Sequence, residues 1–124
     1  MICLVSYGKV IAQLSKAYPY DSGIEYDTNV YFVEKFDDGL ENILSRYSTV
    51  VNGDGMSLET DCPDGLNGGK SLKVHSIQGV NSGGYLYKHF QEGFDNEIYV
   101  RYYVKYPATS VNFFHHEGVW IGGY

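Results

Sequence analysis

Polar and apolar side chains alternate most regularly between residues 97 and 106, where the chain reads EIYVRYYVKY. A repeat of two is typical of a β-strand with one buried face. The face suited to a core carries Ile98, Val100, Tyr102, Val104 and Tyr106. The opposite face carries Glu97, Tyr99, Arg101, Tyr103 and Lys105, so aromatic rings alternate there with cations. Such a face suits sugars and carboxylates, and the pattern predicts a strand that also forms a binding surface.

Shorter alternating or apolar segments predict further strands, separated by turns rich in glycine, asparagine and aspartate. They span residues 29–36, 47–52, 56–60, 70–77, 85–90 and 111–120. The quartet NGDG at residues 52–55 is a strong hairpin signal, because asparagine and glycine accept the positive φ of tight turns. Residues 40–46 are expected to form one helical turn or a loop.

Short strands at regular intervals, with no long helical pattern, predict an all-β fold, an antiparallel β-sandwich or jelly roll over residues 29–124. Residues 1–28 are expected to be a leader or an irregular lead-in, with a short helix as the alternative. The chain stops close to its last expected strand, which would leave that strand without a neighbour. We therefore expect a jelly roll that is incomplete at its C-terminus, a fragment of a longer protein. The alternative is a small sheet that closes by oligomerising.

Composition supports this fold class and argues against some classes of binding partner. Among 124 residues there are 13 tyrosines and 15 glycines but only 3 prolines, which favours β-structure with many turns. The net charge of −6 argues against a nucleic-acid partner, which would require a basic surface. No apolar run is long enough to predict a membrane span. Cys3 and Cys62 show no metal-type spacing and either pair in an exported protein or stay as thiols.

Several segments carry a resemblance to a known family. They are FDDGL at 36–40, GKSLKV at 69–74, GYLYK at 84–88, YVRYYVKYP at 99–107 and FHHEGVWIGGY at 114–124. Together they resemble the concanavalin A-like jelly-roll proteins, and within that group the polysaccharide lyase-type domains. The resemblance implies a secreted protein that holds an acidic polysaccharide on a concave β-sheet. It also implies that Arg101 and Lys105 bind uronate carboxylates, while Tyr99 and Tyr103 line the groove.

The residues themselves allow a cleavage mechanism as well as binding. β-Elimination requires a cation on the carboxylate and a base next to it. Tyr103 is the first candidate, since Arg101 and Lys105 on the same face supply the positive charge that a tyrosine base needs. His115, which shares a strand face with Glu117, is the second candidate for proton transfer. The alternative is that an aromatic–cation row simply stabilises an exposed sheet face.

Metal chemistry has weaker support. Glu34, Asp37 and Asp38 near one turn, or Asp54, Asp61 and Asp64 near others, have the oxygen ligands that Ca²⁺ prefers. Acidic side chains in turns are usually solvated, so no cofactor is expected, and calcium is the alternative. Trp120, the only tryptophan, is expected in the core, with sugar stacking as the alternative.

Three functions remain after these considerations. The first is binding of an acidic polysaccharide, with or without β-elimination cleavage, by an extracellular protein. The second is a non-catalytic carbohydrate-binding or lectin-like module. The third is a structural or adhesive surface domain whose tyrosines contact other proteins.

Overall fold

The computed structural model describes residues 2–6, 11–63, 65, 69–94, 97–108 and 118–122. Within these residues seven strands outnumber two short α-helices, which confirms the all-β class in its coarse form. The strands are β1 (Ile2–Ser6), β2 (Val30–Glu34), β3 (Thr49–Val51), β4 (Met56–Glu59), β5 (Ser71–Val74), β6 (Tyr85–Tyr87) and β7 (Ile98–Tyr102). The helices are α1 (Ile11–Ala17) and α2 (Leu40–Ser45), with 3-10 turns η1 (Pro19–Asp21), η2 (Ile24–Tyr26) and η3 (Gly53–Gly55).

The strands form one antiparallel sheet of three and two antiparallel ribbons. The sheet has the order β2-β1-β7, and the ribbons pair β3 with β6 and β4 with β5. The described part therefore establishes a strand-rich fold, and the β-sandwich or jelly roll stays a prediction.

The first 28 residues contain more regular structure than an irregular lead-in. β1 is the central strand of the sheet and pairs with β2 and β7, and α1, η1 and η2 follow it. These elements are not irregular, and α1 is the short helix that was expected as the alternative. The run Ile2 to Val5 is apolar, and a continuous apolar run also suits a strand of a sheet that has layers on both of its faces. Whether the segment is a removable leader stays a prediction.

The hairpin expected at residues 52–55 is wrong, although the turn itself is present. Asn52 takes the left-handed conformation at φ 52°, and the amide of Gly55 donates to its carbonyl at 2.9 Å. The strands on either side nevertheless pair elsewhere, β3 with β6 and β4 with β5. A turn signal describes only four residues, whereas pairing depends on which strand can bury its apolar side chains.

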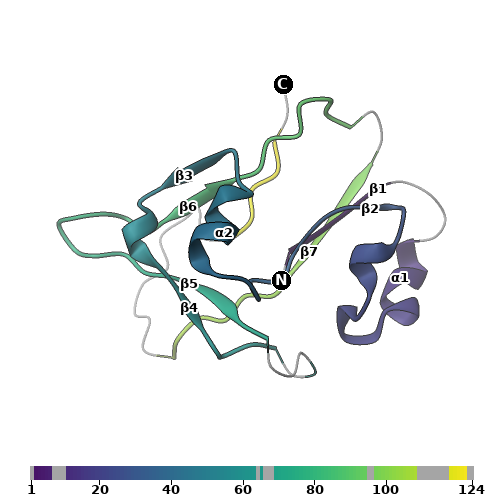
Figure 1. The fold of residues 1–124 in the computed structure, drawn as a ribbon, viewed down its shortest axis with the longest axis horizontal. Coiled ribbons are helices and arrows are strands. Elements are labelled where there is room, and N and C mark those ends of the chain that lie inside the picture. The colour runs from purple at the N-terminus through teal and green to yellow at the C-terminus, as the bar shows by residue number, and fades with distance from the viewer. Residues whose placement is uncertain are drawn as a thin grey trace.

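The three-stranded sheet separates two apolar clusters (Figure 1). One consists of Leu14 and Ile24, with Tyr18, Val30 and Val33 packed against it. The other consists of Phe36, Ile43 and Tyr47, with Phe32, Leu58, Leu72 and Leu86 packed against it. α1 and the 3-10 turns after it lie on one side of the sheet, and α2 with the two ribbons lies on the other.

β7 is shorter than predicted, and its apolar face is only partly covered. The strand ends at Tyr102 instead of residue 106. Ile98 and Val100 are half-buried, but Tyr102, Val104 and Tyr106 are exposed, so the expected core face is wrong beyond Val100. β7 is an edge strand, which leaves its outer end with few side chains to pack against.

Two expectations concern the C-terminal part of the chain, the core position of Trp120 and a strand at residues 111–120. Trp120 is 84% exposed, so its predicted core position is wrong. Of the strand expected at 111–120, residues 118–120 are not in a strand, and the remainder lies outside the described residues.

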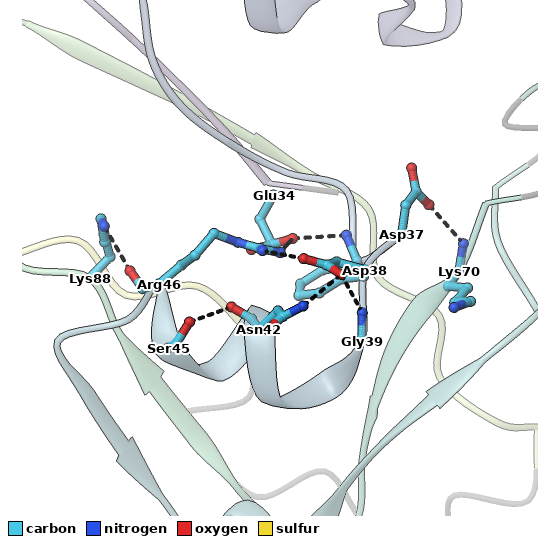
Figure 2. Close-up of polar contacts among 10 residues, drawn as sticks. Glu34, Asp37, Asp38, Gly39, Asn42, Ser45, Arg46, Lys70 and Lys88 are labelled. Carbon is cyan, nitrogen blue, oxygen red and sulfur yellow. Dashed lines mark hydrogen bonds and ion pairs between the residues drawn. The ribbon is translucent and has the colours of Figure 1, made fainter.

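A buried carboxylate joins β2 to the end of α2 (Figure 2). Glu34 is 1% exposed, and the Arg46 guanidinium donates to both of its oxygens, each at 2.9 Å. The Phe36 amide also donates to Glu34 at 2.9 Å. Arg46 reaches Asp38 at 3.1 Å as well, so one cation serves two carboxylates. This geometry is the bidentate kind in which arginine holds a carboxylate most firmly.

Tyr47 lies in the same core with a buried hydroxyl that lacks a hydrogen-bond partner within the described structure. Burial raises the pKa of this phenol, and the nearby charge of Glu34 acts in the same direction. Because an unpaired buried polar group destabilises the folded state, Tyr47→Phe should raise the free energy of unfolding by about 1 kcal/mol. Urea denaturation measures this change, and a loss of stability would show that the hydroxyl has a partner.

Candidate functional site

Arg101 points toward the layer that contains α1, η1 and η2. Cys3 of β1 pairs with Val33 on one side and with Arg101 on the other. Residues opposite one another in antiparallel strands share a face. Val33 packs against the Leu14–Ile24 cluster, so Arg101 lies over the same side of the sheet. That side of the sheet is partly covered by α1, η1 and η2, and the open concave groove stays a prediction.

Asp21 is the residue that Arg101 meets there. Its side chain is buried, and its carboxylate forms an ion pair with the Arg101 guanidinium and accepts a hydrogen bond from the Tyr103 hydroxyl at 2.9 Å. Both Tyr20 and Asp21 have left-handed backbones, at φ 54° and 59°. Each such residue costs about 1–2 kcal/mol. The two polar contacts offset this strain and hold η1 against the end of β7.

Lys105 has a separate partner. Its ammonium lies 2.6 Å from a carboxylate oxygen of Asp61, beyond the end of β4. The two side chains are 75% and 60% exposed. Tyr99 is also exposed, and its hydroxyl donates to Glu97 at 2.9 Å. The structure thus brings Arg101 and Tyr103 together on Asp21, while Lys105 and Tyr99 each contact another carboxylate.

The contacts of Arg101 and Tyr103 do not provide the arrangement that β-elimination requires. Arg101 forms an ion pair with the buried carboxylate of Asp21, and the Tyr103 hydroxyl donates a hydrogen bond to the same carboxylate. Neither arrangement prepares a vacant cation beside a base, which β-elimination would require. His115, the other candidate for proton transfer, lies outside the described residues. Catalysis at Tyr103 or His115 stays a prediction.

The sequence missed the partner that organises this site. Asp21 is 80 and 82 residues away from Arg101 and Tyr103, and no local motif marks it. The sequence indicated Asp61 only as a possible calcium ligand, whereas in the structure its carboxylate pairs with Lys105. An excess of acidic residues around a cationic row is the one available signal, and it does not identify which carboxylate pairs with which cation.

A shallow depression of about 510 Å³ lies elsewhere, along β2 and the end of α2. Its lining includes Glu25, Arg46 and Lys88 but none of the four predicted substrate-contact residues. Glu25 is paired with Lys35 and Arg46 with Glu34. Lys88 donates to the Arg46 carbonyl at 2.7 Å. The charged side chains that line the depression therefore already have partners within the protein.

The acidic residues considered for calcium also have protein partners. Asp38 accepts hydrogen bonds from the Asn42 side chain and the Gly39 amide, and these lower the pKa of its carboxyl. Asp37 accepts the Lys70 amide at 3.2 Å. Within the described residues there is no group of three or more potential ligands that could hold a metal ion. The described helices likewise include none that is long and apolar enough to cross a bilayer.

Comparison of the chain with protein-family models, curated proteins and solved structures finds no match.

Proposed function

We propose that the protein binds an acidic polysaccharide at the surface formed by Tyr99, Tyr103 and Lys105. The observation that carries this proposal is the Lys105–Asp61 pair, a cation held against an exchangeable carboxylate two residues from an exposed tyrosine ring. Binding alone is proposed, because the described contacts of Tyr103 do not prepare it as a base. The secreted location and the completed jelly roll belong to the same proposal.

Exchange at Lys105 requires little free energy. Ion pairs between exposed side chains contribute only about 0–1 kcal/mol, so a uronate carboxylate can replace Asp61 at little cost. Tyr99 and Tyr103, each near half exposed, supply flat faces against which a sugar ring packs while their hydroxyls remain hydrogen-bonded.

Arg101 has a different part in this proposal. Withdrawing it from Asp21 would leave a buried carboxylate without its counter-ion, which is strongly unfavourable. Arg101 therefore acts as a positioning residue: it holds Asp21, and Asp21 holds the Tyr103 hydroxyl.

Two substitutions should change the affinity in opposite directions. Lys105→Ala removes the carboxylate contact and should weaken binding to sodium alginate about fivefold, the value of one exposed ion pair. Asp61→Asn removes the competing carboxylate and should strengthen it. Retardation in native gels containing alginate measures both effects.

Lys73→Ala is the matched control. Lys73 lies on β5 and pairs with Glu59 at 3.2 Å, again with both side chains exposed. Its loss therefore changes the net charge equally, but outside the surface proposed for alginate. The proposal fails if Lys73→Ala and Lys105→Ala reduce retardation by the same amount, or if alginate does not retard the unaltered protein.

A further inference from the structure

β6 carries two tyrosines that no part of the proposed alginate surface uses. Tyr85 and Tyr87 are 37% and 53% exposed. Their ring centroids lie 6.5 Å apart, and the ring planes differ by 27°. The pairs Val51–Tyr85 and Thr49–Tyr87 place all four side chains on one face of the β3–β6 ribbon.

The opposite face of the ribbon anchors it. Leu86 packs against the Phe36–Ile43–Tyr47 core, so its neighbours on β6 must point the other way. Hydrogen bonds hold both ends: Ser82 and Tyr85 join through their hydroxyls at 2.9 Å, and the Ser48 amide donates to the Tyr87 carbonyl at 2.8 Å. The two rings are thus carried on a fixed strand, which reduces the entropy lost when a ligand binds.

We infer that Tyr85 and Tyr87 form a stacking platform for a neutral saccharide chain, separate from the alginate surface. Two near-parallel rings, spaced on the scale of one sugar unit, can each pack on the C–H face of a successive unit. Tyrosine suits this ligand because its ring packs while its hydroxyl bonds to polar groups at the edge.

The surroundings of the platform favour an uncharged ligand of small contact area. None of the four side chains on this face of the ribbon is charged. An acidic chain would find no cation among them. A stable protein interface buries roughly 800 Å² on each partner, from about 20–30 residues. The ribbon has only three residues in each strand, which suffices for a sugar but not for such an interface.

The test uses hydroxyethylcellulose gels, with alginate gels run beside them. The double variant Tyr85→Ala/Tyr87→Ala should lose at least about fivefold in affinity for hydroxyethylcellulose, because each lost ring removes an aromatic contact. It should keep its retardation in alginate. Tyr87→Phe, which retains the ring, should retain most of the binding. Tyr26→Ala is the control, since Tyr26 is 84% exposed on η2, away from the ribbon.

A second measurement avoids any dependence on folding of the double variant. In the unaltered protein, cellohexaose should shift the ring NMR signals of Tyr85 and Tyr87 and leave those of Tyr26 in place. The inference is overturned if those two signals do not move, if hydroxyethylcellulose does not retard the protein, or if Tyr26→Ala weakens binding equally. Failure in alginate alone would overturn the proposed function and leave this platform standing.

Discussion

Arg46→Met is expected to lower the free energy of unfolding by about 3 kcal/mol, because it leaves the buried carboxylate of Glu34 without its cation. The range for breaking a buried pair extends higher, but the Arg46 side chain is 37% exposed, so water already screens part of the interaction. The same substitution removes the contact with Asp38. For a chain of this length, the melting temperature should fall by roughly 10 °C.

Lys73→Met provides the comparison for this result. It breaks an ion pair in which both side chains are about half exposed, and it should change stability by less than about 1 kcal/mol. Adding Glu34→Leu to Arg46→Met should recover part of the loss, since the unpaired charge is then gone. Equal destabilisation by Arg46→Met and Lys73→Met in urea titrations would contradict the described burial of Glu34.

The second large effect is expected from Ile43→Ala. Ile43 is 0% exposed and forms one cluster with Phe36 and Tyr47, against which Leu58, Leu72 and Leu86 of the ribbons also pack. Truncating a fully buried isoleucine should destabilise the fold by about 3 kcal/mol, through lost burial and the cavity that remains. Ile43→Val should lose only about 1 kcal/mol.

Thermal or urea unfolding followed by circular dichroism measures this loss. Val80→Ala is the control, because Val80 is 71% exposed and should change stability by no more than about 0.5 kcal/mol. If Ile43→Ala were as mild as Val80→Ala, the described burial of Ile43 in the cluster with Phe36 and Tyr47 would be contradicted.

Local pattern was sufficient to locate most of the described elements. Strands observed at Val30–Glu34, Met56–Glu59 and Ser71–Val74 lie inside segments that alternation and turn residues predicted. A helical turn at Leu40–Ser45 was one of two expected outcomes and is the one observed. These features depend on neighbours within a few residues, so the chain displays them directly.

Strand pairing could not be read in the same way. β1 lies between β2 and β7, partners that follow it by about 30 and 100 residues. Which strands meet depends on how apolar side chains from distant segments share a core. The NGDG turn illustrates this limit, because it forms as expected yet does not join the strands on its two sides.

In the candidate site, too, the local sequence predicted one part, and contacts between distant segments determined the other. Alternation in the run from Glu97 to Tyr106 predicted a strand, and it predicted that tyrosines and cations would share a face. It could not predict that Arg101 would form an ion pair with Asp21, or Lys105 with Asp61. Side-chain order follows from backbone geometry, which is local. The availability of a charge depends on which carboxylate the folded chain brings beside it, and that was decided only when η1 and the end of β4 met the residues of β7 and those beyond it.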